Sequence, residues 1–419
     1  MGELLARVFS SFREVRFRYL WLSIAMNGYS NTLSLVALSW MALEFTGSPL
    51  GVGLVIASRT IPKLVLSLPL GMLSDRMDRR LLIQMTNYAG AATAAAAVVI
   101  SIAGGVNIYV VLVLAVCVGA FDAAQTTFCK AYVIDLVGRD EAVNGMTMEM
   151  LANRVFGIIG GFTSGFLLQS LGGMATFIAM GVAYFLSAAI LHAIPRFCLD
   201  GSRRHDEEGL VEDSRLPDWQ IITGLLRNPI VLIFASIALL AEVFACSSDV
   251  LLPSFARDIH QVGEVGLGTL FALSNTGGVI ALLVMAAFAT RIDSEKMLLV
   301  SAAMFGLSLV LFSLAPVFAI AAVVIILVGM AWSLVDVLLP TVLQCGVRDC
   351  DRGAVVGIWN LSRGFGPLGQ LEIGYLASTV GVAFTQTING TIFLVSTLFL
   401  AFLYYRNRSL ARVPGALAS

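Results

Sequence analysis

The stretch PLGMLSDRMDRRLLIQ, residues 69–84, places five charged residues almost side by side between two apolar runs. They are Asp75, Arg76, Asp78, Arg79 and Arg80. Apolar runs of this kind are typical of membrane-spanning helices, and basic residues gather in the short loops on the cytoplasmic side of a membrane. We therefore expect this stretch to be a cytoplasmic turn between two spans.

The composition of the whole chain agrees with a membrane protein. Of its 419 residues, 58% are hydrophobic and 13% are charged, whereas soluble proteins carry about 25% charged residues. A membrane helix needs about 20 predominantly apolar residues. Twelve segments meet this rule, near 17–42, 50–73, 81–103, 107–130, 143–169, 173–194, 229–252, 265–289, 297–315, 317–343, 354–378 and 387–406.

The placement of lysine and arginine predicts how these spans are oriented. Basic residues lie before the first span, in alternate turns, in the polar segment 196–228 and after the last span, while the opposite loops carry almost none; Arg257 is the exception. By the positive-inside rule, both termini lie in the cytoplasm of a multi-pass protein of the plasma (bacterial inner) membrane. Segment 196–228 reads as a cytoplasmic linker between a first bundle, 1–195, and a second, 229–419.

The two halves of the sequence resemble each other. With a shift of 215 residues, Gly51 and Gly53 lie over Gly266 and Gly268. With a shift of 209, a run in the fifth span lies over one in the eleventh. The fold class expected is all-α, with twelve transmembrane helices in two pseudo-symmetric six-helix bundles, as in transporters that rock two bundles about a central site. The residues matched in that run are Arg154, Phe156, Gly157, Gly160 and Gly165, over Arg363, Phe365, Gly366, Gly369 and Gly374.

The opening stretch also carries a spaced motif. Gly71, Leu73, Asp75, Arg76, Arg79 and Arg80 fit G-x-L-x-D-R-x-x-R-R, which resembles the signature of the major facilitator superfamily. The resemblance implies that Asp75 latches the two halves together at span 11, on the cytoplasmic side, while the cavity faces outward. Gly71 would permit close helix approach, and Arg76, Arg79 and Arg80 would hold the turn in register.

At two places the sequence departs from the common superfamily patterns, and there it resembles one group of exporters. Asp78 stands where many members of the superfamily have glycine, and this variant, with LEFTGSPLGVGL at 43–54, resembles bacterial exporters of drugs, macrolides and siderophores that exchange substrate for protons. The run at 160–165, GGFTSG, is a partial match to the G-P-x-x-G-G element of exporting antiporters.

Charged residues inside the spans are candidates for function, because each costs about 2.5–3.5 kcal/mol at the bilayer centre. Similar depths along antiparallel helices predict two ion pairs, Asp122 with Arg154 and Asp336 with Arg363. Such pairs either exchange a proton for substrate or only fix the positions of the helices. The charged residues within the spans are Arg59, Lys63, Asp122, Glu149, Arg154, Glu242, Asp249, Asp336, Arg363 and Glu372.

Glu242 and Asp249 are the preferred candidates for proton coupling, ahead of Asp122 and Asp336. They are seven residues apart on one helix face, in a span that the resemblance assigns to the cavity lining. Arg59, Lys63, Arg154 and Arg363 are the expected charge partners. Interhelical packing is the alternative role for the candidate pocket residues, which are Asn27, Asn31, Gln125 and Trp332.

The function expected is secondary active transport, by alternating access, with proton-coupled efflux of amphipathic small molecules. An importer or facilitator of an anionic metabolite or lysolipid is an alternative, as is a transport-inactive membrane sensor. The sequence contains no Walker loop, and its six cysteines and three histidines form no metal-binding pattern. We expect a monomer in the lipid bilayer, with a small-molecule substrate and a proton as partners, and no enzymatic activity, cofactor, metal or nucleic acid.

Overall fold

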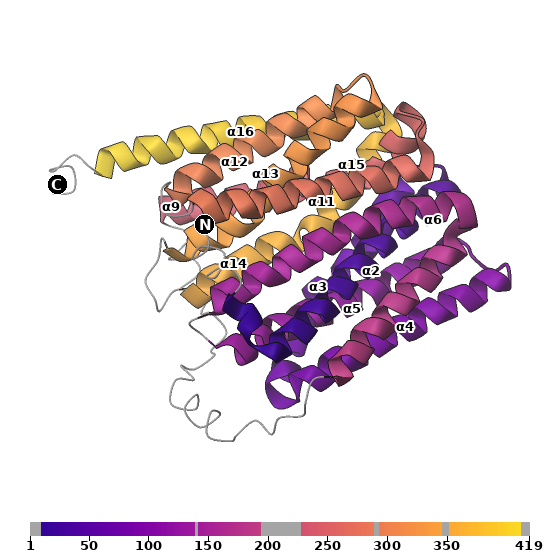
Figure 1. Ribbon diagram of the computed structural model, residues 1–419. Coiled ribbons are helices and arrows are strands. Elements are labelled where there is room, and N and C mark those ends of the chain that lie inside the picture. The colour runs from indigo at the N-terminus through magenta and orange to yellow at the C-terminus, as the bar shows by residue number, and fades with distance from the viewer. Residues whose placement is uncertain (1–9, 139–140, 194–227, 289–292, 346–351, 412–419) are drawn as a thin grey trace.

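Long helices make up the protein (Figure 1). The computed structural model describes residues 10–138, 141–193, 228–288, 293–345 and 352–411, and no strand occurs in these ranges. The predicted linker 196–228 lies outside them except for Asn228. The fold class predicted from the sequence is confirmed in this part of the chain.

The first group of helices follows the predicted spans closely. After a short 3-10 turn, η1 (Ser10–Arg13), come α2 (Val15–Thr46), α3 (Pro49–Arg76), α4 (Arg79–Ile102), α5 (Ile108–Val137) and α6 (Ala142–His192). Helix α6 contains two legs, because the backbone leaves helical geometry at Gly172, with φ 77° and ψ 179°. Gly172 adopts this left-handed φ without a Cβ clash, and the two legs correspond to the predicted fifth and sixth spans.

The second group contains two interrupted helices. Its regular members are α11 (Gly263–Phe288), α12 (Ser294–Ser313), α13 (Phe318–Cys345) and α16 (Val382–Ala411). The predicted eleventh span is broken at Phe365 into α14 (Arg352–Gly364) and α15 (Gly366–Val380). The helix of the predicted seventh span changes winding and runs on past residue 252. Its parts are α9 (Pro229–Leu240), η2 (Ala241–Ala245), η3 (Cys246–Val250), α10 (Leu252–Ser254) and η4 (Phe255–Ile259).

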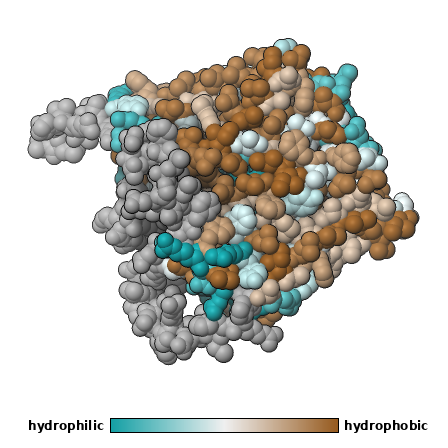
Figure 2. Space-filling model, in the orientation of Figure 1, coloured by the Kyte–Doolittle hydropathy of each residue, from teal (hydrophilic) through white to brown (hydrophobic). Residues whose placement is uncertain are grey.

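Most of these helices are long and apolar enough to cross a bilayer. Within the described residues, nine helical stretches meet criteria of length and hydropathy, with α6 counted once and residues 229–259 as one stretch. The three other predicted spans coincide with helix α2, the second leg of α6 and the α14–α15 pair. Apolar residues cover most of the face seen in Figure 2, and hydrophilic ones lie mainly toward the ends of the helices.

Asp78, in the charged stretch between α3 and α4, has a structural role as a helix cap. Helix α3 ends at Arg76 and α4 begins at Arg79. The Asp78 carboxylate accepts a hydrogen bond from the backbone N–H of Arg80 at 2.9 Å and so caps α4. An aspartate at this position satisfies an N–H group that the helix cannot pair internally.

Glycine contacts reveal the predicted repeat in three dimensions. A Cβ built on Gly165 of α6 would lie 3.2 Å from Cα of Gly268 in α11. A Cβ built on Gly374 of α15 would lie 3.5 Å from Cα of Gly53 in α3. Because the sequence repeat matches Gly165 with Gly374 and Gly53 with Gly268, the two crossings between the groups are equivalent.

The same equivalence holds inside each group. A Cβ on Gly90 would meet Tyr184 at 3.1 Å, and one on Gly306, at the matching place between α12 and α16, would meet Leu394 at 2.9 Å. A Cβ on Gly119 would meet the backbone of Arg59, and one on Gly329 would meet that of Ser274. Small residues let membrane helices approach this closely, and the repeat places them at corresponding crossings.

The two groups touch mainly at one end. The helix ends that lead to residues 194–227 lie on the left in Figure 1, and we call this the linker end. At the opposite, far end the glycine crossings are tight, and Arg257 Nη1 donates to the carbonyl of Leu43 at 3.1 Å. At the linker end, a Cβ on Gly71 or Gly357 would meet no atom of the described residues within 4 Å. Among the described residues, the contacts between the groups are therefore tightest at the far end.

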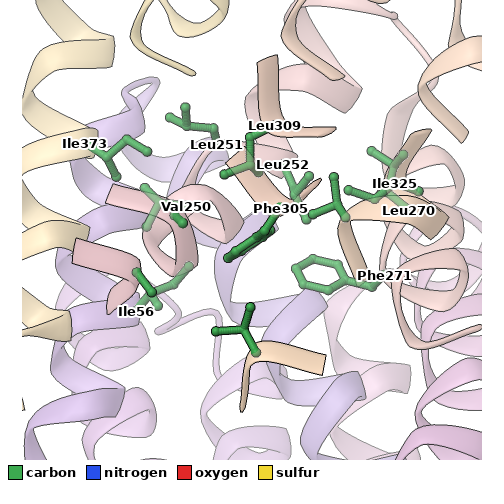
Figure 3. Packing of buried hydrophobic residues seen from close by; sticks show 14 of the residues in the cluster. Ile56, Val250, Leu251, Leu252, Leu270, Phe271, Phe305, Leu309, Ile325 and Ile373 are labelled. Atoms are coloured by element: carbon green, nitrogen blue, oxygen red, sulfur yellow. The ribbon is translucent and has the colours of Figure 1, made fainter. Parts of the chain in front are cut away.

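An apolar core joins the groups around their middle. Figure 3 shows Ile56 of α3 near Val250 of η3 and Ile373 of α15, with Phe305 and Phe271 beside them. All five belong to one buried cluster.

Candidate functional site

Asp122 is held by a network within the first group. Lys63 of α3 forms an ion pair with Asp122 of α5. Asn31 of α2 donates to Asp122 Oδ1 at 2.8 Å, and Arg59 Nη2 donates to the Asn31 carbonyl at 3.4 Å. The predicted pair of Asp122 with Arg154 is wrong, because α3 packs closely on α5 and brings Lys63 to the carboxylate.

Arg363 joins two carboxylates in the second group. Its Nε lies 3.6 Å from Oε1 of Glu242, and its Nη1 lies 3.8 Å from Oδ1 of Asp336. The guanidinium also lies over the Trp359 ring, 5.1 Å from the centroid. The predicted pair of Asp336 with Arg363 is confirmed, whereas the contact of Arg363 with Glu242 was not expected.

This ion cluster lies where two helices are irregular. Glu242 belongs to the π-helical turn η2, and Arg363 precedes the break between α14 and α15. A Cβ on Gly366 would lie 3.4 Å from Oε2 of Glu242. π-helical turns inside α-helices occur frequently at functional sites, where they redirect side chains.

Arg154 reaches from the first group into the second. Its Nη1 donates to Oδ1 of Asn275 in α11 at 3.5 Å, and its electrostatic neighbours are Asp336 and Asp249. A Cβ on Gly278 would lie 2.9 Å from the Arg154 side chain, so the glycine leaves room for it. Arg154 and Arg363, which the repeat matches, thus both face carboxylates of the second group.

A cavity of about 220 Å³ lies between the two groups. Four predicted site residues line it: Asn31, Arg154, Asp249 and Trp332. The Asp249 residue is exposed. Both charge signs and several aromatic rings therefore surround one space. The remaining lining residues are Thr32, Leu35, Cys246, Ser248, Phe271, Ser274, Asn275, Phe305 and Val328.

A smaller cavity of about 50 Å³ lies within the first group. The predicted residues Asn27, Asn31, Asp122 and Gln125 line it, and Asn27 also donates to Ser187 Oγ at 2.7 Å. Asn31 thus borders both cavities. The other lining residues are Ile24, Thr86, Phe121, Thr126, Cys129, Glu149, Asn153 and Tyr184.

Several lining residues were not predicted from the sequence. Asn275 had a signal, since it is a carboxamide inside an apolar span, as Asn27 and Asn31 are. Phe271 and Phe305 had none, because the chain has 25 phenylalanines and nothing in the sequence separates those that face a cavity from those that face lipid.

The charged turn at the linker end fastens helices of the first group. Arg79 Nη1 donates to Oδ1 of Asp135 at 2.6 Å, and Arg80 Nε donates to the Leu191 carbonyl at 3.0 Å. Asp75 accepts from Arg79 at 3.4 Å, and 74% of its side chain is exposed. The expected latch between Asp75 and span 11 concerns a structure closed at this end, so the role of Asp75 stays a prediction.

Apolar helices surround a polar cavity that is lined by charged residues of both groups. This arrangement is that of a membrane protein that holds a small molecule between two helical bundles. The chain belongs to the Major Facilitator Superfamily, whose family model matches residues 20–369. This family, and the transporters to which the chain is similar, indicate that the protein transports small molecules and is not an enzyme.

Characterised relatives cover most of the chain at low identity. The multidrug efflux pump Tap of Mycolicibacterium fortuitum is 27% identical over 367 residues, 85% of this chain and 87% of the relative. The staphyloferrin A transporter of Staphylococcus aureus (strain NCTC 8325 / PS 47) is 24% identical over 399 residues, 93% of this chain and 95% of the relative. The enterobactin exporter EntS of Salmonella choleraesuis (strain SC-B67) is 22% identical over 378 residues, 89% and 85%.

Solved structures show the same fold. The nucleoside transporter NupG aligns with a TM-score of 0.73 and 13% identity, covering 93% of this chain and 99% of that one. A bacterial homologue of the human lysosomal transporter Spinster, in an inward-facing and occupied conformation, aligns with a TM-score of 0.70 and 15% identity, covering 94% and 97%.

Proposed function

We propose that the protein exports amphipathic small molecules in exchange for protons. The observation that carries the proposal is the cavity of about 220 Å³ between the groups, which is lined by Arg154, Asp249 and aromatic rings. Polar and charged side chains beside aromatic rings suit molecules that have both an apolar body and a polar part. The named activities of Tap and EntS favour export.

The substrate would reach this cavity by alternating access. Bundles 1–195 and 229–419, joined by linker 196–228, would rock against each other, with the linker end and both termini in the cytoplasm of a bacterial cell. The structure, closed at the far end, would then be the form that loads substrate from the cytoplasm. In the opposite form Asp75 would latch the bundles, with Gly71, Arg76, Arg79 and Arg80 shaping the turn. The transporter would work as a monomer in the inner membrane.

Proton exchange would take place at the carboxylates near the cavity. Asp249 is the foremost candidate, because it is exposed to the cavity and has Arg154 as an electrostatic neighbour. Glu242 and Asp336 share Arg363, so protonating one carboxylate would leave the arginine to the other. In the first bundle, protonating Asp122 would likewise free Lys63, with Arg59 beside it.

Everted membrane vesicles test the proposal with ethidium as the probe. An imposed pH gradient, acidic inside, should drive ethidium into vesicles that contain the wild-type protein. Glu242→Gln and Asp249→Asn should reduce this accumulation, while Glu44→Gln, the matched change at an exposed carboxylate near the far end of α2, should not. Full gradient-driven accumulation by both variants would exclude those two residues as coupling sites.

The same assay separates the alternatives. Ethidium movement only down its own gradient would indicate a facilitator, and proton-driven movement in the opposite direction would indicate an importer. Absence of counterflow for ethidium, enterobactin and a lysolipid in proteoliposomes would favour the transport-inactive sensor.

A further inference from the structure

Glu149 is a buried carboxyl group that the proposed mechanism does not use. It lies on the first leg of α6 with 7% of its surface exposed. Among the residues that the structure describes, no hydrogen bond or ion pair reaches its carboxyl group. Asp122, in contrast, has Lys63, and Glu242 has Arg363. A buried carboxylate without a partner is costly, so the neutral, protonated form is the one that this environment favours.

The cavity of about 50 Å³ gives Glu149 polar surroundings. Gln125, which also lines it, is 9% exposed, and its side-chain oxygen accepts no hydrogen bond from the described residues. A buried acceptor without a donor costs free energy, and a protonated carboxyl group or a water molecule supplies that donor. The cavity has room for a few water molecules, which would connect Glu149 with Gln125 and Asp122.

Few charges face Glu149 from the neighbouring elements. Among the described residues, the charged residue that acts on it is Lys130 of α5, which is exposed. On α11, Asn275 is hydrogen-bonded to Arg154 and not to Glu149. The charged residue of η1 is Arg13, which is exposed. The other polar groups on the cavity are Asp122, Thr126 and Cys129 of α5, Asn153 and Tyr184 of α6, the neutral Asn27 and Asn31 of α2, and Thr86 of α4.

The repeat shows that the fold does not require this carboxyl group. With the shift of 209 residues, Glu149 corresponds to Ile358, which is 6% exposed. The crossings at Gly119 and Gly329 set a shift of 210 for α5 and α13, which places Gln125 over the fully buried Val335. The second group therefore builds the same helix packing with apolar side chains, and the polar set around Glu149 is specific to the first.

We propose that Glu149 is a proton-binding site inside the first bundle, separate from the cavity between the bundles. A proton from bulk water adds to a carboxylate oxygen of Glu149, forming an O–H bond and removing one negative charge; its release reverses both changes. Asn31 connects the site with substrate, because it borders both cavities and donates to Asp122. The coupling to substrate, though not the proton site itself, rests on the proposed function.

Infrared titration of the purified protein tests the proton site without any substrate. Wild type should show a carboxyl band that responds to pH and is absent from Glu149→Gln, while Glu44→Gln should keep it. Glu149→Ile copies the side chain that the second bundle carries at this place, and it should also lack the band. Spectra of both Glu149 variants that match wild type would overturn the proposal.

A transport experiment tests the coupling. In proteoliposomes, Glu149→Gln should lower pH-gradient-driven ethidium accumulation by about tenfold or more, within the usual range of coupling between two sites. Ethidium counterflow, which needs no proton movement, should persist, and Glu149→Asp should restore accumulation. Undiminished gradient-driven accumulation by Glu149→Gln would contradict the coupling. If wild type itself shows no gradient-driven accumulation, the proposed function fails, and the infrared titration still decides whether Glu149 binds a proton.

Discussion

Gly165 of α6 and Gly268 of α11 meet backbone to backbone, since a Cβ on Gly268 would lie 2.8 Å from Cα of Gly165. The contact joins the two halves of the transporter at the far end, and the repeat reproduces it between Gly374 and Gly53. Contacts this short leave no space for even one methyl group. The form closed at the far end therefore depends on glycine at these crossings.

Gly268→Ala should disfavour closure at the far end. The added methyl group would press on the backbone of Gly161 and Gly165, so the form closed there should become less populated and transport should fall. Distances between spin labels on α6 and α11 at the far end would measure the change. Gly105→Ala is the matched control, because its Cβ would meet Ile100 only at an ordinary 3.5 Å. Unchanged distances in Gly268→Ala would show that the crossing tolerates a side chain.

The ion pair of Lys63 with Asp122 should appear as coupling in a double-mutant cycle. Lys63→Ala and Asp122→Ala should each lower the thermal stability of the purified protein, and the double variant should lose less than their sum. We expect a coupling energy of about 0.5–3 kcal/mol, as for residues in direct contact. A cycle of Arg154→Ala with Asp122→Ala should be additive, because Lys63 and not Arg154 contacts Asp122. Coupling in the second cycle alone would contradict the structure.

Periodicity and charge placement predicted most of the fold. The apolar runs located the helices, since about 20 apolar residues are needed wherever a chain crosses a bilayer. They could not locate the break at Phe365 or the π-helical turn at Ala241–Ala245, because those depend on how neighbouring helices pack. Gly366 and Glu242, for instance, come close only after α15 has packed on η2.

The site was predicted only in part, because it too depends on how neighbouring helices pack. Depth along the helices correctly placed Asp336 near Arg363, but depth does not specify which way a helix faces. Asp122 and Arg154 have similar depths, yet Arg154 faces Asn275 of α11. The residue that pairs with Asp122 is Lys63. Helix rotation is set by contacts such as that of Gly119 with the backbone of Arg59, which a single sequence does not reveal.

Substitutions at Asp78 should separate capping from charge. Asp78→Ala should lower the stability of the protein by about 1 kcal/mol, because the backbone N–H of Arg80 loses its acceptor. Asp78→Gly should cost only a few tenths of a kcal/mol, since glycine is itself a fair N-cap residue. Urea or thermal unfolding in detergent measures both. Equal losses in the two variants would mean that the carboxylate acts through its charge and not as a cap.

Asp75→Asn should change the balance between conformations without weakening the form described here. In this form 74% of the Asp75 side chain is exposed, and its one ion-pair contact in the described residues is the long one to Arg79. If Asp75 latches the opposite form, the variant should shift the population toward the form that is open at the linker end. Spin labels on α3 and α14 at that end should then report longer average distances than in wild type, while Glu44→Gln, at an exposed far-end carboxylate, should leave them unchanged. Identical distance distributions for Asp75→Asn and wild type, in the presence and absence of a pH gradient, would remove Asp75 from the latch.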